Sequence, residues 1–432
     1  MTTAKEEENT KSIELNYWRK RIFISLWVTY GTFYLTRVNM SIALPLIMEE
    51  FGYSRTAMGA VLTALFAFYA FGQFVNGQLG DKFGSRKFIT IGLVATATLN
   101  IAFGFANGLS VMILIWGLNG YFQSMGWAPT VKTLANWFPR KIRGKFGGAL
   151  GTSYQIGNAY SWVLAGFVAG ALGWRWCFWI PAIIVVVSAI HWYLRGRNAP
   201  EEVGLPTIEE ECKGTDDARG VREDCHLGFR YTLNSVLRTR SIWLVAFGLF
   251  GLNIVRYGFI DWAPTYMFQI QHAPISTAAY KALAIPLAGS VGALFSGWIS
   301  DKLFQSRRAP IAAVMLLLLG LFAWLYPRIP VSQWELSLVV LIMVGFLTYG
   351  PHVLMVTTMP MDFATRKAAA SATGFIDGMG YIGAAITGIL SGWLIDNLGW
   401  YSAFYFWVSA AIMAAILMAI LWNYKAAEGK YQ

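Results

Sequence analysis

The sequence predicts an all-α membrane protein with twelve transmembrane helices in two pseudo-symmetric six-helix bundles. Three observations carry this prediction: the composition, the recurrence of long apolar segments, and a partial repeat of the first half in the second. Of 432 residues, 56% are hydrophobic and 13% are charged, whereas a soluble protein has about 25% charged residues. The net charge of +11 comes from short basic clusters between apolar segments. Such clusters are typical of membrane-protein loops, so we expect surrounding membrane lipids and no nucleic-acid partner.

Apolar segments of about 20 residues, the length that crosses a bilayer as a helix, recur along the whole chain. In the first half, spans are predicted at 22–47, 57–80, 88–107, 110–135, 145–170 and 175–195. In the second half, they are predicted at 240–268, 277–300, 310–327, 335–358, 368–394 and 400–424. The two bundles are thus predicted at 22–195 and 240–424, with a hydrophilic linker at 196–239 and polar tails at 1–21 and 425–432. The first apolar segment is interpreted as a retained helix and not as a cleaved signal peptide.

Lysine and arginine in the short loops predict the orientation. The loops on one side carry most of the basic residues, for example Arg140 and Arg143, whereas the loops on the other side carry few, such as Arg55 and Arg175. Positively charged loops remain in the cytoplasm. We therefore expect both termini and the linker to be cytoplasmic, in the cytoplasmic membrane of a bacterium or archaeon.

The second half of the chain repeats short segments of the first. Residues 77–82 (Gly-Gln-Leu-Gly-Asp-Lys) match residues 297–302 (Gly-Trp-Ile-Ser-Asp-Lys), and both halves contain an Arg-Lys pair followed by a glycine-rich segment that ends Leu-Gly-Trp. A repeat in the same orientation predicts two bundles related by an axis along the membrane normal. Such a pair encloses a cavity that can open to either side, which is the architecture of a transporter.

Two arginines are predicted near the middle of the membrane. Arg37 lies about 15 residues into the first span and Arg256 about 15 residues into the seventh, close to the spacing of the repeat. A charge at this depth is costly, so it faces a cavity or a partner. Two converging guanidinium groups suit a divalent oxyanion, because each can bind two oxygens. The alternative is that an arginine pairs with a helix carboxylate, for which Asp261 is one candidate.

Two other ionisable residues lie within predicted spans. Asp377 is a candidate proton site, a partner for a cation, a contact for substrate hydroxyls, or a carboxylate that only joins two helices. His352 is a weaker candidate, since a lone histidine among apolar residues is more often structural.

The turn between the second and third spans has the pattern Gly77-x-x-x-Asp81-Lys82-x-Gly84-x-Arg86-Lys87, which resembles the signature loop of the major facilitator superfamily. A second copy begins at Gly297 and contains Asp301. The carboxylate of such a loop can cap a neighbouring helix and hold a gate closed, so a gating role is expected for Asp81, Arg86 and Asp301.

Longer segments resemble the organophosphate:phosphate antiporter family, which includes glycerol-3-phosphate and hexose-phosphate transporters. The stretch that is most specific runs from Arg256 to Tyr266 (Arg-Tyr-Gly-Phe-Ile-Asp-Trp-Ala-Pro-Thr-Tyr), and others are 34–37, 126–129 and 345–351. The resemblance implies that Arg37 and Arg256 bind phosphate. It also implies an aromatic wall around the site, made of Tyr30, Tyr34, Tyr69, Trp127, Tyr349 and Tyr381.

Three positions distinguish this chain within the resemblance. Gln73 and Tyr154 stand where glycerol-3-phosphate transporters carry a lysine and a histidine, and Asp377 is added. We expect these three residues to contact hydroxyl or amine groups of the substrate.

The resemblance implies that a small organic phosphate is exchanged for inorganic phosphate by alternating access, in a monomer without a cofactor. The alternatives are a proton- or sodium-coupled symporter of an organic carboxylate and a sensor of sugar phosphate derived from a transporter. The sequence has no nucleotide-binding loop, no metal-ligand spacing and no nucleophile beside a base, so we expect neither a metal site nor an enzyme. Its three cysteines do not form a disulfide framework.

Overall fold

A computed structural model describes residues 2–207, 237–304, 307–360 and 369–423, and these residues form helices joined by short turns. The first half contains the following elements. They are α1 (Thr2–Phe33), η1 (Tyr34–Thr36), α2 (Asn39–Phe51), α3 (Arg55–Phe83), α4 (Ser85–Gly104), α5 (Leu109–Gln123), α6 (Trp127–Trp137), α7 (Arg140–Leu172), α8 (Trp176–Arg195) and η2 (Pro200–Val203).

The second half repeats this arrangement with different interruptions. Its elements are α12 (Arg240–Gln269), α13 (Ile275–Ala282), α14 (Ala284–Lys302), α15 (Arg308–Leu325), η3 (Tyr326–Arg328), α16 (Trp334–Val353), the π-helical η4 (Leu354–Thr358), α18 (Ala369–Leu398) and α19 (Trp400–Ile420). Most of the expected linker and the expected tail at 425–432 lie outside the described residues. The expected tail at 1–21 is, from Thr2 onward, a continuation of α1.

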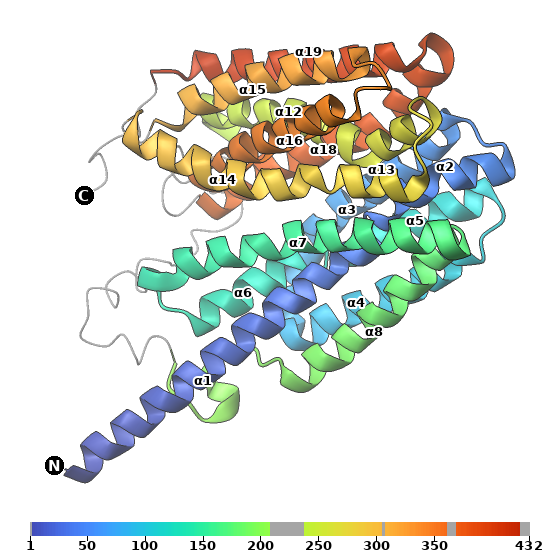
Figure 1. The fold of residues 1–432 in the computed structure, drawn as a ribbon. Helices are drawn as coiled ribbons and strands as arrows, with labels where there is room; N and C mark the ends of the chain where they lie inside the picture. Colours follow the sequence, from blue (N-terminus) through green and yellow to red (C-terminus); the bar gives the residue numbers. More distant parts are fainter. Residues whose placement is uncertain (1, 208–236, 305–306, 361–368, 424–432) are drawn as a thin grey trace.

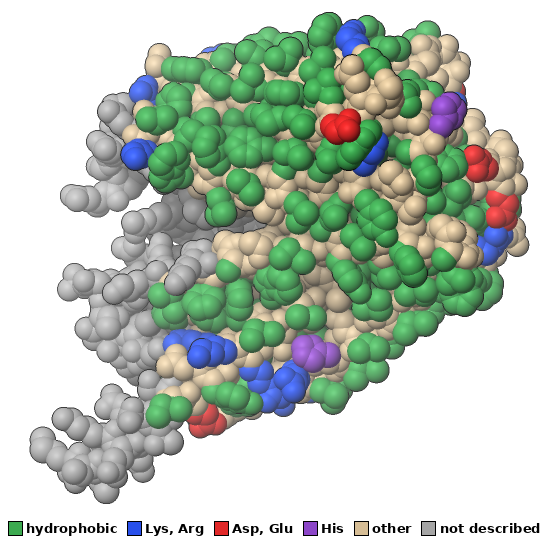
Figure 2. Space-filling view, in the orientation of Figure 1, with side chains coloured by type: hydrophobic (Ala, Val, Ile, Leu, Met, Phe, Trp, Pro, Cys, Tyr) green, Lys and Arg blue, Asp and Glu red, His purple; other side chains and the backbone are tan. Residues whose placement is uncertain are grey.

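Nine helical segments within the described part of the chain are long and apolar enough to cross a membrane. The three remaining expected spans are not among these nine helices, and the structure shows why. The spans expected at 22–47 and 110–135 are each divided into two helices, and the one expected at 145–170 lies in α7, which begins with a basic segment and is rich in glycine and polar residues. Figure 2 shows a largely hydrophobic face, as expected for a surface in contact with lipid.

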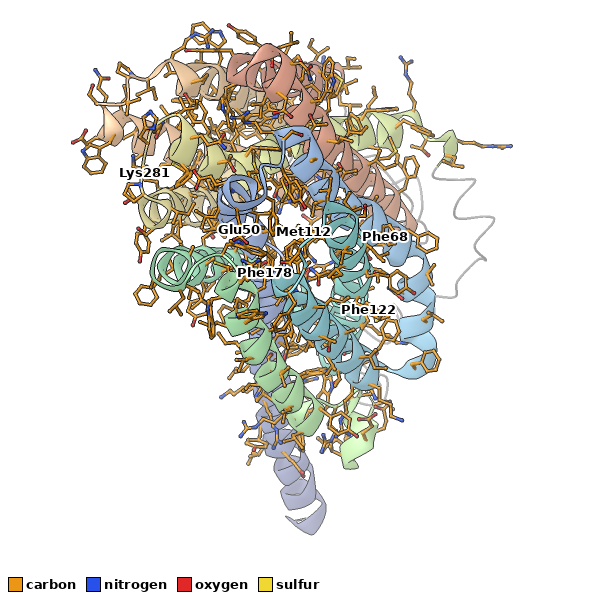
Figure 3. All side chains as sticks on the ribbon, turned by 90° about the vertical axis from the view of Figure 1, so that its right-hand side faces the viewer. Glu50, Phe68, Met112, Phe122, Phe178 and Lys281 are labelled. Carbon is orange, nitrogen blue, oxygen red and sulfur yellow. The ribbon has the colours of Figure 1, made fainter. Side chains whose placement is uncertain are left out.

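The two halves form two adjacent helical bundles whose long helices run in a common direction (Figure 1). The start of α1 and the end of α19 lie at the same end of this assembly. We call this end the terminal side and the other end the opposite side. Figure 3 looks onto the opposite side, where Glu50 of the first bundle and Lys281 of the second are labelled.

The bundles are joined most tightly between α3 and α18 on the opposite side. Asp396, at the end of α18, accepts hydrogen bonds from the backbone N–H groups of Arg55 (3.2 Å) and Thr56 (2.7 Å), and therefore caps α3 from the other bundle. Arg55 also forms an ion pair with Asp396 at 3.4 Å. Further along the same crossing, Gly59 and Gly388 lie so close that a Cβ on either one would collide with the backbone of the other. The contact therefore requires glycine at both positions.

Candidate substrate-binding site

The first expected span is broken beside Arg37. The helix α1 ends at Phe33, a 3₁₀ turn follows, and α2 begins at Asn39. A break in a membrane helix frees backbone carbonyl groups, which must find other donors. Side-chain amides supply them: Gln123 Nε2 donates to Phe33 O at 3.0 Å, and Asn119 Nδ2 donates to Thr36 O at 2.9 Å. Arg37 therefore lies outside regular helix, at a break whose backbone is held by Asn119 and Gln123 of α5.

Arg37 is buried, with 6% of its surface exposed, and is held between two aromatic rings. Its guanidinium carbon lies 4.7 Å from the ring centres of both Tyr34 and Tyr69. Its Nε donates to Gln123 Oε1 at 3.2 Å, while Nη2 is buried and has no hydrogen-bond partner among the described residues. Arg37 thus keeps a donor that an anion could use.

Arg256 has an equivalent setting in the second bundle. It is 6% exposed, and its guanidinium carbon lies 5.0 Å from the ring centres of both Tyr257 and Tyr349. Its Nη1 lies 2.9 Å from His352 Nε2, and its Nε is buried without a hydrogen-bond partner in the described part of the chain. A guanidinium has only donors, so His352 Nε2 is the acceptor in this contact and the ring proton of neutral His352 is on Nδ1.

Arg256 is not paired with Asp261, the alternative that the sequence left open. The ion pairs found between described residues join Arg55 to Asp396 and Arg175 to Glu50, and neither includes Arg256 or Asp261. Asp261 is nearly fully buried, and its Oδ2 has no hydrogen-bond partner among the described residues.

Aromatic rings connect the surroundings of the two arginines. Tyr34, which packs on Arg37, also stacks with Tyr154 at 5.8 Å between ring centres, and Tyr154 interacts electrostatically with Arg256. Tyr69, the other ring on Arg37, lies 4.6 Å from Tyr381 of the second bundle. The two arginines therefore belong to one site that spans both bundles.

The remaining predicted site residues lie around this centre at different distances. Asp377 of α18 interacts electrostatically with both arginines. Tyr30 lies 6.0 Å from Tyr34 and 4.9 Å from Trp127 between ring centres, so Tyr30 and Trp127 form an outer part of the wall. Gln73 is partly buried on α3, one helical turn beyond Tyr69. Gln73 therefore lies near the site but does not contact either arginine.

The expected gating residues lie at the terminal side. Asp81 is in α3 and Asp301 is in α14, but their side chains lie outside the described part of the structure. Arg86 is the second residue of α4, where its Nε donates to the carbonyl oxygen of Tyr193 at 2.7 Å and its guanidinium carbon lies 4.8 Å from the centre of the Tyr193 ring. In this structure Arg86 therefore joins α4 to the end of α8.

Three residues of the site were missed or undervalued from sequence. Gln123 and Tyr257 were not predicted at all, although each contacts an arginine, and His352 was interpreted as more often structural. Tyr257 directly follows Arg256, so its adjacency was a usable signal. The sequence gives no such signal for Gln123, because its partner lies 86 residues away.

The geometry suits the binding of a small oxyanion. Two buried guanidinium groups supply positive charge, and each has a buried N–H without a partner among the described residues. Asp377 interacts electrostatically with both arginines and Asp261 with Arg256, but neither carboxylate forms an ion pair with them. Hydrogen bonds between guanidinium and phosphate or carboxylate oxygens are strong and directional. Among the described residues no group of His, Cys, Asp and Glu could hold a metal ion.

A multi-helix membrane protein with two buried arginines between two repeated bundles has the form of a transporter. The family model described as Major Facilitator Superfamily matches residues 26–388. Together with the relatives below, this match shows that the chain belongs to the major facilitator superfamily, in the organophosphate:phosphate antiporter family. It is a membrane transport protein of that family and not an enzyme.

Relatives with curated descriptions match along nearly the whole chain. The "Probable hexose phosphate transport protein" of Chlamydia pneumoniae is 31% identical over 97% of this chain and 94% of its own length. The "Glycerol-3-phosphate transporter" of Bacillus subtilis is 31% identical over 94% of this chain and 92% of its own length. The "Membrane sensor protein UhpC" of Escherichia coli is also 31% identical, over 94% of this chain and 92% of its own length.

A solved structure supports the fold. A bacterial homolog of the human lysosomal transporter Spinster, in an inward-facing and unoccupied conformation, matches with a TM-score of 0.74 and 14% identity. The match covers 93% of this chain and 95% of that one. At this identity the likeness concerns the fold alone.

Proposed function

We propose that this protein exchanges a small organic phosphate, of the glycerol-phosphate or sugar-phosphate type, for inorganic phosphate by alternating access. The observation that carries the proposal is the pair Arg37 and Arg256. Each is buried between two tyrosine rings and each keeps an N–H without a partner among the described residues. Comparison with hexose-phosphate and glycerol-3-phosphate transporters supports a phosphate ester as the substrate.

The charges explain why exchange is favourable. Closing the site around two arginines without a ligand is costly, whereas a bound phosphate dianion offsets their charge while the bundles change between the two open states. The same two arginines bind both inorganic phosphate and the phosphate group of the organic substrate. Other residues must therefore recognise the organic part of the substrate. We assign that part to Asp377, Tyr154 and Gln73, with hydroxyl or amine groups as their ligands.

Alternating access is supported by the uneven contact between the bundles. Asp396 caps α3 across the interface on the opposite side, and the same side carries the Gly59–Gly388 crossing. We assign the terminal side to the cytoplasm, since the loops there are the basic ones. In that orientation the cap closes the extracellular side, and the transport cycle must break it.

A second candidate is an ion-coupled symporter of an organic anion. The position of Asp377 favours it, because this carboxylate interacts electrostatically with both arginines and could carry a coupled proton. The similarity to a membrane sensor protein favours a third role, detection of a sugar phosphate without transport.

The proposal is tested by exchange in proteoliposomes loaded with inorganic phosphate. Labelled phosphate should enter, and glycerol 3-phosphate, glucose 6-phosphate or phosphoglycerate should compete. Arg37→Lys and Arg256→Lys should each slow exchange about 10- to 100-fold, because lysine keeps the charge but loses the paired donors. The matched control is Arg328→Lys, a half-buried arginine stacked on Trp324 and away from the site, which should change exchange less than about twofold.

The competing roles predict different results in the same assay. Exchange that needs a proton or sodium gradient and no internal phosphate would overturn the antiporter. Folded protein that binds a sugar phosphate without any flux would identify a sensor. Asp377→Asn should change which organic phosphates compete, and an unaltered order of competitors would remove Asp377 from substrate recognition.

A further inference from the structure

A cavity lies at the terminal side of the first bundle, away from the central arginines. Its volume is about 460 Å³, and it forms where α3 ends, α4 begins and the chain leaves α8. Its lining residues are Phe83, Arg86, Lys87, Arg197, Asn198 and Glu202. Half of these are cations, so the cavity suits an anionic group.

Asn198 holds the cavity in a defined shape. Its Oδ1 accepts from the backbone N–H of Arg86 at 2.8 Å, and its backbone carbonyl accepts from Asn136 Nδ2 at 3.0 Å. Next to it, the carbonyl of Arg197 accepts from Trp137 Nε1 at 3.1 Å. The segment after α8 is thus attached to both α4 and α6, and a ligand would meet a site that needs little ordering.

The two arginines are oriented but not neutralised. Arg86 uses its Nε for the Tyr193 carbonyl, which leaves its two terminal nitrogens for a ligand. Arg197 donates from Nη1 to the carbonyls of Leu194 and Gly196 and lies 5.7 Å from the ring of Trp18. Neither of them, nor the exposed Lys87, forms an ion pair with another described residue.

Among the described residues that line the cavity, Glu202 is the one carboxylate, and it is already engaged. Its Oε2 accepts from the backbone N–H of Asn198 at 3.0 Å, and its Oε1 accepts from the side-chain amide of the same residue. Glu202 therefore lowers the positive charge but serves to position Asn198. Taken together, the described lining residues carry three positive charges and one negative charge, so their net charge is positive.

The surface around the cavity is apolar on the side that faces lipid. On α8, Ile190 is 55% exposed and Leu194 is 61% exposed, and Ile91 of α4 is similarly exposed. Tyr193 and Trp18 lie on Arg86 and Arg197, at the depth where aromatic residues mark a membrane interface. Figure 2 shows Lys and Arg side chains gathered near the terminal end of the first bundle beside this hydrophobic face.

We propose that this cavity binds the phosphate headgroup of an anionic phospholipid, whose acyl chains lie along the exposed faces of α4 and α8. A soluble anion would use the cations alone, whereas an anionic lipid uses both the cations and the apolar residues beside them. Basic pockets at the ends of transmembrane helices are suited to such headgroups. The cavity is separate from the central arginines, so this proposal does not depend on the identity of the transported substrate.

The test is lipid binding by the purified full-length protein in detergent, measured by native mass spectrometry with dioleoyl phosphatidylglycerol and dioleoyl phosphatidylcholine as probes. The wild type should retain phosphatidylglycerol preferentially. The double variant Lys87→Gln/Arg197→Gln should lose about 30-fold in affinity for phosphatidylglycerol and little for phosphatidylcholine, as expected for two charges at a membrane surface. The charge-preserving variant Lys87→Arg/Arg197→Lys should retain most of the preference.

The matched control removes two cations on the same side of the second bundle, Lys302→Gln/Arg307→Gln, and should bind phosphatidylglycerol like the wild type. Equal loss in this control would show a general surface charge and overturn the proposed cavity. Displacement of the lipid by millimolar inorganic phosphate, or equal binding of a short-chain phosphatidylglycerol, would show a soluble-anion site instead. The thermal unfolding of each variant without added lipid verifies that the change is not a folding defect.

Discussion

Arg37 and Arg256 occupy corresponding places in the two bundles, yet their neighbours are not equivalent. Both guanidinium groups lie between two tyrosine rings at similar distances. Arg37 is held by Gln123, a neutral amide, whereas Arg256 is held by the imidazole of His352. The repeat has conserved the aromatic setting of the charge and has changed the residue that orients it.

These neighbours indicate that the first half of the site is held rigidly, whereas the second half can adapt. Gln123 also donates to Phe33 O and to Thr36 Oγ1, so the side chain that orients Arg37 also holds the helix break. His352 follows Pro351 in α16, directly before the π-helical η4, and its Nδ1 has no partner among the described residues. Proline and π-helical turns weaken the regular backbone ladder and are frequent at functional sites.

The largest expected effect that would test this contrast is on stability. Gln123→Ala removes the donor to Phe33 O and the acceptor for Arg37 Nε, and so leaves two buried polar groups without a partner. The cost should be about 2–5 kcal/mol in the free energy of unfolding, with loss of exchange. His352→Ala should cost less, because the His352 contacts with described residues include no backbone group in a helix break.

Thermal unfolding of both variants in the same detergent measures the difference. Gln333→Ala, at an exposed position before α16, is the matched glutamine control and should unfold like the wild type. Equal destabilisation by Gln123→Ala and His352→Ala would refute the view that the first half is the fixed one.

A smaller effect should show whether His352 acts by accepting a hydrogen bond from Arg256 through Nε2 or by donating one through Nδ1. Glutamine at position 352 can still accept a hydrogen bond from Arg256 Nη1, whereas leucine cannot. His352→Leu should therefore weaken phosphate binding about tenfold and His352→Gln by no more than about threefold. The concentration of phosphate that gives half-maximal exchange measures this. If both variants weaken binding equally, the acceptor is unimportant and the Nδ1 proton is what the substrate uses.

The burial of the two arginines could be predicted from sequence, because a charge within an apolar segment is costly and the repeat sets its counterpart. The aromatic residues around them were predicted only through the family resemblance. The break beside Arg37 could not, since residues 34–38 contain neither glycine nor proline. The amides that satisfy the break come from Asn119 and Gln123, more than 80 residues away. His352 looked isolated for the same reason: its partner Arg256 is 96 residues away in sequence. The Asp396 cap on α3 was equally hidden, because it joins positions more than 300 residues apart.

An exposed arginine supplies the baseline for the two buried ones, and here the smallest effect is expected. Arg175 forms an ion pair with Glu50 at 2.7 Å on the opposite side, where the side chains are 31% and 40% exposed. A hydrogen bond from Trp174 and the adjacent Arg175 lower the pKa of Glu50 below its ordinary value. The stability that Glu50 contributes is therefore full above its ordinary pKa and is lost as the pH falls through the lowered one.

Glu50→Gln should destabilise the protein by no more than about 1 kcal/mol at neutral pH, because solvent screens this pair. As the pH falls through the lowered pKa of Glu50 and the wild-type carboxylate takes up its proton, the two proteins should converge in unfolding temperature. Added salt should also reduce the difference at neutral pH, since it screens exposed charges more than buried ones. A destabilisation as large as that of Gln123→Ala, unaffected by salt, would mean that the partner of an arginine matters equally inside and outside the membrane. The contrast between the buried and exposed arginines would then fail.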